Sequence, residues 1–395
     1  MNAPALGEQV HGFNEPRRRI LRIDPLLLLA AVGLMLCSVY TVGTATQDDI
    51  PGNELYYVYR QSAYAGVGLL LMLLVSRFDY SRIREWKFGV YALMIGAIVL
   101  TYAVGATARG SKRAIEFGFI NLQSSELGKL LLILALSAFV VDRMRRIGDR
   151  ETTSRIMLLA LIPSMLVVAQ PDLGSGLVYI AIALAILFVA GTKWTHFAAL
   201  GALGVVAVVV VLVAAPAVGV EVLKPYQVDR LTAFLHPTSN PDKQGYQVNQ
   251  SLTAVGSGGK TGRGDQATQT RLDFLPEHHT DFVFSVVGEE FGFVGAALVL
   301  SLFALLIWRS LRILTMSKNL YGALIAGGIT AMLMFQVFVN VGMTIGIMPI
   351  TGVPLPLLSY GGSSVLVTFL AIGLLQSIHA QAREIAAAKG LNRDL

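Results

Sequence analysis

Long apolar runs, separated by short polar segments, dominate the pattern of hydrophobic and polar positions in this chain of 395 residues. A helix needs roughly 20 residues to cross a hydrocarbon core of about 30 Å. The pattern therefore predicts an all-α polytopic membrane protein with about ten transmembrane helices. The predicted spans lie near residues 26–46, 58–76, 88–106, 124–142, 156–170, 173–191, 196–218, 282–308, 321–345 and 363–382.

The distribution of basic residues predicts which side of the membrane holds the chain ends. Cytoplasmic loops are enriched in Lys and Arg. Placing the N-terminus inside assigns most of the 31 basic residues but fewer than half of the 25 acidic ones to the cytoplasm. Both termini are therefore predicted to be cytoplasmic. Residues 1–24 form a polar tail without the pattern of a signal peptide, and residues 25–395 form a single transmembrane domain.

Composition excludes several other classes of protein. Only 14% of the residues are charged, against about 25% in soluble domains. The single cysteine, Cys37, permits neither an internal disulfide nor a cysteine metal cluster. Only His278 and His279 are adjacent among six histidines, which we read as evidence against a zinc site. The net charge of +6 is explained by the basic residues that membrane proteins carry in their cytoplasmic loops, so no nucleic-acid partner is predicted.

One extracytoplasmic segment, residues 219–281, is much longer than the other loops, and long loops often carry function. Its mixture of Phe, Leu, Pro and Gly argues against a plain linker. Residues Gln247 to Val255 predict a short amphipathic helix on the surface, followed by a glycine-rich turn.

Charged residues inside or beside the spans are functional candidates, because such charges are costly in a bilayer. In the stretch QPDLG, Asp172 follows an apolar run that begins at Ile156 and is too short to cross the membrane. Asp172 is thus expected at a hairpin tip, either as a cap of the next helix or as a functional group. Glu126 and Lys129 are three residues apart, so they share a helix face and can pair.

Two further places attract attention. Arg109, Lys112 and Arg113 form the only dense external basic cluster in the predicted topology. A phosphate-bearing lipid or substrate headgroup is the favoured explanation, and ordinary anchoring to lipid headgroups is the alternative. Asp281 precedes the long eighth span. Either its carboxylate caps the N-terminus of that helix, a role that Thr280 could also fill, or it is a functional group. Below it, Glu289 and Glu290 are expected to pair with a basic neighbour inside the bundle.

Five ordered motifs carry a resemblance to a known family. They are LQSSELGK, AQPDLGS, GYQVNQSLTAVGSGGKTGRG, RLDFLPEHHTDFVFSVVGEEFGFVG and NVGMTIGIMPITGVPLPLLSYGGSS. The chain resembles the SEDS family (shape, elongation, division and sporulation), and its elongation branch more than its division branch. It departs from the family pattern at Ser124, where a proline is usual, and at Ala114, where a tryptophan is frequent.

The resemblance implies a peptidoglycan glycosyltransferase that polymerises lipid II into glycan strands and releases undecaprenyl pyrophosphate. It implies that Asp281 is the catalytic residue. Candidate substrate-binding residues are Lys112, Arg113, Glu126, Lys129, Gln170, Asp172, Lys260, Arg263, Glu277 and His279. The metal ligands, if any, are unknown.

Glycosyl transfer needs a base for the attacking hydroxyl and positive charge for the departing pyrophosphate. Asp281 would act as the base, or would orient the hydroxyl or hold a metal ion, since a helix N-terminus stabilises its anion and weakens it as a base. Lys112, Arg113 and Lys129, or a divalent cation such as Mg²⁺ or Mn²⁺, would supply the charge. No other cofactor is predicted.

The resemblance also implies partners and a location. The partners are lipid II, a class B penicillin-binding protein, other proteins of the elongation complex, and bilayer lipids. The protein is expected in the bacterial cytoplasmic membrane with its active site on the extracytoplasmic side, where a lateral opening under the 219–281 segment would admit lipid II. A division-type paralogue, a lipid II flippase and a non-enzymatic scaffold are the alternatives.

Overall fold

The computed structural model describes residues 23–47, 49–50, 52–104, 106–108, 111–117, 120–217, 227–228, 230, 234, 244–272 and 274–388. For the residues between 106 and 120, and for Ala215, Gln244, Arg271 and Ala388, the description covers the backbone alone.

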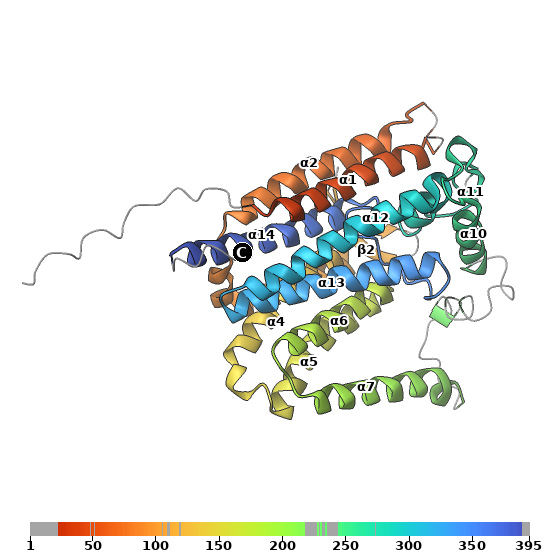
Figure 1. Cartoon of the computed structure of the whole chain (residues 1–395). Coiled ribbons are helices and arrows are strands. Elements are labelled where there is room, and N and C mark those ends of the chain that lie inside the picture. Colours follow the sequence, from red (N-terminus) through yellow and green to blue (C-terminus); the bar gives the residue numbers. More distant parts are fainter. Residues whose placement is uncertain are drawn as a thin grey trace, which may run out of the picture.

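The long helices run in roughly the same direction (Figure 1). Among the described residues, nine helical segments are long and apolar enough to cross a membrane, and α6 is a shorter apolar helix. These ten segments coincide with the ten predicted spans. They are α1 (Pro25–Ala45), α2 (Tyr56–Ser76), α3 (Lys87–Val104), α4 (Ser124–Asp142), α5 (Arg150–Ala169), α6 (Leu173–Val189), α7 (Trp194–Val209), α12 (Val283–Met316), α13 (Leu320–Thr344) and α14 (Gly362–Ala388).

Shorter elements complete the chain. A 3₁₀ turn precedes α3, and α7 continues through a π-helical turn into the short helix α8. Two helices, α10 and α11, precede α12 at the end of the bundle opposite to the start of α1 and the end of α14 (Figure 1). The bounds are η1 (Tyr80–Trp86), η2 (Met144–Arg146), η3 (Val210–Ala214), α8 (Ala215–Ala217), α10 (Gln244–Ser257), η4 (Gly264–Gln266) and α11 (Thr268–Arg271).

The prediction that the fifth span is too short to cross a membrane is wrong. Helix α5 begins at Arg150, before the apolar run, and reaches 20 residues. In the polar first turns Glu151 and Arg155, four residues apart, form an ion pair on one helix face, a contact that favours the helix. Counting apolar residues alone therefore underestimated the length of this helix.

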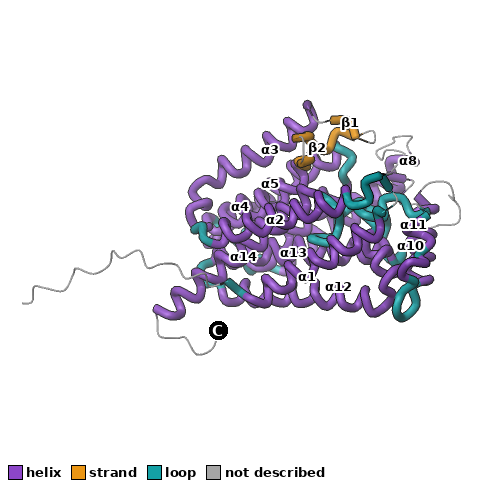
Figure 2. The backbone as a smooth tube through the Cα atoms, turned by 90° about the horizontal axis from the view of Figure 1, so that it is seen from above, coloured by secondary structure: helices purple, strands orange, loops and turns teal. Residues whose placement is uncertain are grey.

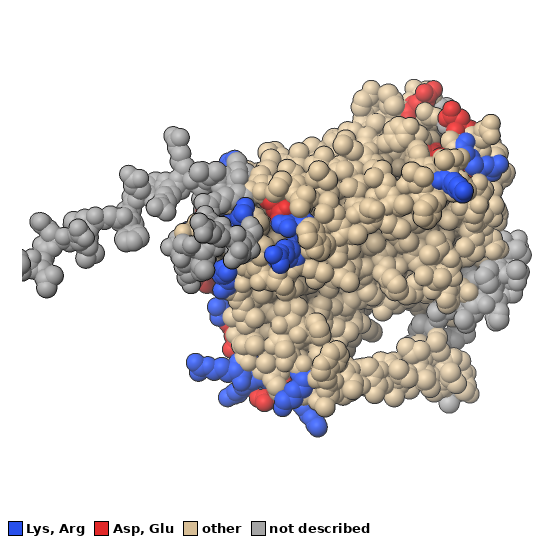
Figure 3. Space-filling view, in the orientation of Figure 1, with Lys and Arg blue, Asp and Glu red and all other residues tan. Residues whose placement is uncertain are grey.

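The helices differ strongly in how deeply they are buried. Helices α4, α13 and α14 are buried over most of their length, whereas α7 has a single buried side chain, His196. Helix α7 lies apart from the other helices in Figure 1, and Figure 3 shows an open hollow between it and the rest of the molecule. A continuous exposed apolar surface of this kind is suited to contact with lipid.

A small antiparallel sheet, which the all-α prediction did not include, connects α3 to α4. Its strands are β1 (Ala106–Ala108), β2 (Ser111–Phe117) and β3 (Ile120–Gln123), in the order β1-β2-β3. The strands lie beside the end of α3 (Figure 2). Lys112 and Arg113 belong to β2, but their side chains lie outside the described part of the structure.

A buried aspartate fastens three helices together where α1 begins. Asp24 accepts hydrogen bonds from the amides of Leu26 and Leu27, which caps α1, and from Arg309 Nε of α12 at 2.9 Å. The Asp24 amide donates to Gln376 of α14 at 2.7 Å. Burial alone would raise the pKa of Asp24, but the hydrogen bond and the charge of Arg309, with the amide bond and the nearby His379, lower the pKa below 3.8.

Candidate functional site

Asp281 lies in a tight turn between α11 and α12. Glu277 has a left-handed backbone (φ 59°), and its carbonyl accepts hydrogen bonds from the amides of Thr280 and Phe282. The Thr280 hydroxyl donates to the Glu277 carboxylate at 2.8 Å. The N-cap of α12 is Phe282, with no side-chain cap hydrogen bond. The structure places the N-cap at Phe282, so the interpretation of Asp281 or Thr280 as the N-cap residue is wrong.

The main chain of this turn is fixed by two other parts of the fold. The fully buried Asn340 of α13 donates from Nδ2 to the Asp281 carbonyl at 2.9 Å and to the Val353 carbonyl at 2.8 Å. Ser359 Oγ donates to the Thr280 carbonyl at 2.6 Å, and the Tyr360 amide donates to the His279 carbonyl at 2.9 Å. These bonds hold the turn at a defined position against residues 353–360.

The Asp281 carboxylate and the guanidinium of Arg230 both lie close to Gly352. The point where a Cβ of residue 352 would stand lies 3.5 Å from Asp281 Oδ2 and 3.8 and 3.9 Å from the terminal nitrogens of Arg230. Arg230 also donates to the Thr351 carbonyl at 3.2 Å. Arg230 was not predicted from the sequence. Its one distinguishing mark there is that it is a basic residue within a segment predicted to be functional.

The Asp172 hairpin meets the same segment. One Asp172 oxygen accepts from the Ser175 amide at 3.1 Å, which confirms the helix-cap prediction, and the other accepts from Ser125 Oγ at 2.9 Å. A Cβ added at Gly174 would stand 2.7 Å from the Thr351 carbonyl oxygen. The hairpin thus packs directly beside Gly352, so the structure brings the surroundings of Asp172 and Asp281 together.

Other predicted residues lie elsewhere. Glu126 and Lys129 form the predicted ion pair, with 2.6 Å between Oε1 and Nζ, and both are almost completely buried. Gln170 is buried, and its amide donates to the Ile98 carbonyl of α3 at 2.6 Å. Lys260 and Arg263 are exposed on the glycine-rich turn.

The glycine-rich turn, residues 258–264, is hydrogen-bonded to α12 on both sides of a break in that helix. The helix leaves helical geometry at Gly292 (φ 61°, ψ −155°). The amides of Phe293 and Val294 then donate to the carbonyls of Gly259 and Lys260, at 3.0 and 3.1 Å. The predicted amphipathic helix before the turn is confirmed as α10, so both elements of the prediction for this part of the 219–281 segment are present.

Glu289 has a different partner from the one predicted. Its carboxylate accepts from the amides of Gln269 and Thr270 and from the Thr270 hydroxyl, at 2.7 to 3.0 Å. The expectation of a basic partner is wrong for Glu289, because backbone amides at the start of α11 supply the hydrogen bonds. Glu290 accepts from Thr44 Oγ1 of α1 at 2.5 Å.

An apolar cavity of about 430 Å³ opens between α1 and α12, near the break in α12. Side chains of both helices line it, and Thr261 from the glycine-rich turn closes one part. Its lining is Cys37, Tyr40, Thr41, Thr261, Val287, Phe291, Val294, Gly295, Leu298 and Val299.

Together these features define a polytopic helical membrane protein with a carboxylate held above the bundle beside a cation. The model of the family described as "Cell cycle protein" (FTSW_RODA_SPOVE) matches residues 21–384. The chain belongs to this FtsW/RodA/SpoVE family, which confirms the resemblance.

Relatives of several kinds match almost the whole chain. Stage V sporulation protein E of Bacillus subtilis is 34% identical and covers 92% of this chain and 97% of its own. Peptidoglycan glycosyltransferase MrdB of Escherichia coli is 35% identical, with 93% and 96% covered. The probable peptidoglycan glycosyltransferase FtsW of Thioalkalivibrio sulfidiphilus is 38% identical, with 91% and 89% covered.

Solved structures agree with the fold. A chain of a peptidoglycan synthase complex for polymerisation and crosslinking superposes with a TM-score of 0.77, at 32% identity, and covers 92% of this chain and 99% of its own. The rod shape determining protein RodA of Thermus thermophilus gives a TM-score of 0.64 at 29% identity, with 91% and 97% covered.

Proposed function

We propose that this protein is a peptidoglycan glycosyltransferase that polymerises lipid II during cell elongation, with Asp281 as its catalytic residue. The observation that carries this proposal is that the Asp281 carboxylate and the Arg230 guanidinium both approach the same point beside Gly352. The family supports the reaction, since similar proteins of the elongation and division types are named peptidoglycan glycosyltransferases.

In this reaction a sugar hydroxyl of one lipid II attacks the anomeric carbon of another. A new C–O bond forms, the bond from that carbon to the pyrophosphate breaks, and undecaprenyl pyrophosphate leaves with the electron pair. Asp281 accepts the proton of the attacking hydroxyl. Arg230, which is always protonated, balances the negative charge that develops on the leaving group. Pyrophosphate leaves without a general acid, so one carboxylate suffices.

Arg230 and the first turn of α12 place positive electrostatic potential near the Asp281 carboxylate. An ionised carboxylate accepts a hydrogen bond well but is a weak base. We therefore propose that Asp281 first orients the hydroxyl and takes its proton late, when the forming bond has made the hydroxyl more acidic.

The apolar cavity between α1 and α12 suits the isoprenoid tail of lipid II. We propose that the end of the bundle that is rich in Lys and Arg (Figure 3) faces the cytoplasm and that Asp281 faces the extracytoplasmic side, a proposal that the positive-inside rule supports. A photoactivatable lipid II should therefore label α1 and α12 near Thr261. Labelling of cytoplasmic loops alone would overturn this route.

The decisive experiment supplies purified protein in detergent with lipid II. No membrane sidedness exists there, so glycan strands report polymerisation and not transport. We expect strands from the wild type and from Asp265→Asn, an exposed acid in the same segment, but none from Asp281→Asn or Asp281→Ala. Unchanged polymerisation in both Asp281 variants would refute the catalytic assignment.

A class B penicillin-binding protein is the proposed partner, supported by the similar chain in a solved polymerisation and crosslinking complex. Co-purification from membranes tests this partnership. The Asp281→Asn variant should retain the partner, since its substitution removes a charge and leaves the fold intact. Failure of the wild type to co-purify with a class B penicillin-binding protein would argue against the proposed partnership.

A further inference from the structure

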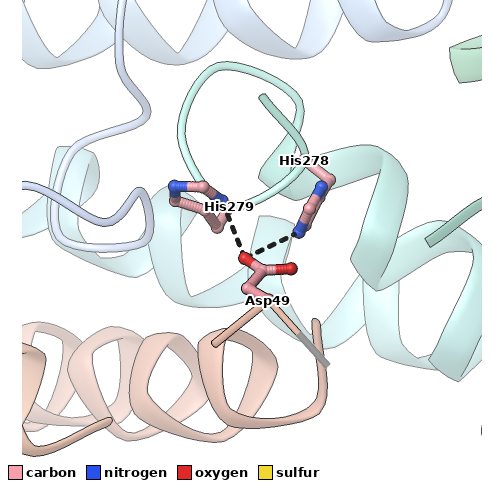
Figure 4. A group of neighbouring side chains, drawn as sticks. All are labelled: Asp49, His278 and His279. Carbon is pink, nitrogen blue, oxygen red and sulfur yellow. Dashed lines mark ion pairs between the residues drawn. The ribbon is translucent and has the colours of Figure 1, made fainter. Parts of the chain in front are cut away.

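Three potential metal ligands lie close together at the turn before α12, although they come from parts of the chain that are far apart in the sequence (Figure 4). Asp49 belongs to the connection between α1 and α2, and His278 and His279 belong to the turn before α12. Asp49 Oδ2 lies 3.6 Å from His278 Nε2 and 3.9 Å from His279 Nδ1, and one ligand atom from each residue lies within 4.8 Å of the others.

The hydrogen bonding of His278 orients its ring for metal binding. Its Nδ1 lies 3.1 Å from the Leu275 carbonyl oxygen. A carbonyl oxygen only accepts, so Nδ1 must carry the hydrogen. In the neutral ring, the lone pair is then on Nε2, which faces Asp49. A ring nitrogen that donates to a backbone carbonyl while the other faces the ion is the usual arrangement of a metal-binding histidine.

His279 packs against two aromatic rings. Its ring contacts those of Tyr57 and Tyr360, with centroid distances of 5.1 and 5.7 Å, and the two tyrosine rings contact each other at 5.0 Å. Its carbonyl accepts the Tyr360 amide. The position of the second imidazole is therefore set by packing before any ion binds, which lowers the entropic cost of forming a site.

The spacing fits a small divalent ion. Ligand atoms bound tetrahedrally at about 2.0–2.1 Å lie about 3.3 Å apart. The two distances to Asp49 exceed this value by about 0.3 and 0.6 Å, and the ligand nitrogens of the two imidazoles lie within 4.8 Å of each other. Two imidazoles and one carboxylate are a donor set that favours Zn²⁺ and similar transition metals over Mg²⁺, which prefers oxygen ligands.

We propose that Asp49, His278 and His279 bind a divalent transition-metal ion of the Zn²⁺ class, with a fourth position open to water or an anionic oxygen. The ion ties the α1–α2 connection to the turn that carries Asp281. Adjacent histidines alone did not predict this site, because the third ligand comes from a distant loop.

Direct metal titration tests the proposal and is independent of the proposed function, since no lipid II is present. The wild type is purified without a polyhistidine tag, stripped with a chelator, and titrated with Co²⁺ while its visible d–d absorption is recorded. We expect one ion per chain, intense absorption typical of four-coordinate Co²⁺, and displacement by Zn²⁺ but not by equimolar Mg²⁺. Absence of this absorption in the wild type would overturn the proposal, whatever the behaviour of any variant.

Matched variants then assign the ligands. Asp49→Asn and His278→Gln should each weaken Zn²⁺ binding at least ~10-fold, the lower limit seen when even an outer partner of a metal ligand is lost. Glu54→Gln removes an exposed acid from the same connection and should leave the affinity unchanged. Equal affinities in all three variants would show that any bound ion lies elsewhere, and that the three residues form only an ion pair between Asp49 and protonated histidines.

Discussion

Four closely spaced glycines in the 219–281 segment allow two steric effects to be separated by single substitutions to alanine. A Cβ at Gly256 meets nothing within 4 Å, and Gly259 is equally open but has φ +56°. A Cβ at Gly258 would stand 1.8 Å from the Gly288 carbonyl oxygen. Gly262 combines both problems, with φ +85° and a Cβ 2.0 Å from the Glu290 carbonyl oxygen.

The expected costs follow from these contacts. A left-handed alanine costs about 1–2 kcal/mol, which is the expectation for Gly259→Ala. Inserting a methyl group against backbone that cannot rotate away costs about 1–3 kcal/mol, which applies to Gly258→Ala. Gly262→Ala should cost about 2–5 kcal/mol, the two effects together. Gly256 lies within α10, where alanine gains about 0.5–1 kcal/mol.

Amide hydrogen exchange measures these costs where they act. The amides of Arg263, Phe293 and Val294 cross between the glycine-rich turn and α12, so their exchange reports local opening. Each 1.4 kcal/mol of local destabilisation raises the exchange rate about tenfold. Exchange should therefore be slowest in Gly256→Ala, intermediate in Gly258→Ala and Gly259→Ala, and fastest in Gly262→Ala. Amides within α13 should be unchanged. If Gly258→Ala and Gly262→Ala exchange like Gly256→Ala, the steric argument is refuted.

Three further predictions concern buried polar groups. Asn340→Leu removes the amide that holds the Asp281 and Val353 carbonyls, so polymerisation should fall at least ~10-fold, since two buried carbonyls lose their donor at about 1–3 kcal/mol each; strand formation in detergent measures it. Lys129→Met leaves the buried Glu126 charge unpaired and should destabilise the protein by about 3–5 kcal/mol, while adding Glu126→Gln should restore most of the loss, as measured by thermal unfolding. The pKa of Asp24 is lowered in the folded protein. The stability that ionised Asp24 gives the fold is therefore complete above pH 3.8 and is lost as the pH falls through the lower folded pKa. The melting temperature should thus drop less steeply with acid in Asp24→Asn than in the wild type.

Each of these has a clear opposing result. Full activity in Asn340→Leu would show that the turn keeps its position without the amide. A double variant no more stable than Lys129→Met alone would place the cost in lost packing and not in the unpaired charge. Identical acid profiles for the wild type and Asp24→Asn would exclude Asp24 as the titrating group.

Hydrophobic patterning predicted the helices well because each span must satisfy its own backbone hydrogen bonds in lipid. It failed at the start of α5, where polar residues extend the helix beyond the apolar run. The pairing of Glu126 with Lys129 was predictable because it is local, at a spacing of three residues on one helix. Arg230 and Asn340 were not selected, since their relation to Asp281 depends on how the loop and α13 fold back over the turn. Motif recognition singled out Asp281, while the geometry removed its interpretation as a helix cap.

The break at Gly292 divides α12 into two parts, and the glycine-rich turn is bonded to both of them. The lower part is anchored through Arg309 to the buried Asp24 at the start of α1, and its Phe293 and Val294 amides donate to the turn. The upper part, from Val283 to Phe291, accepts from the same turn at the Glu289 carbonyl and from α11 at the Glu289 carboxylate. The turn therefore acts as a splint across the break, so that a movement of the bundle is transmitted to the upper part of α12 and to the turn that carries Asp281.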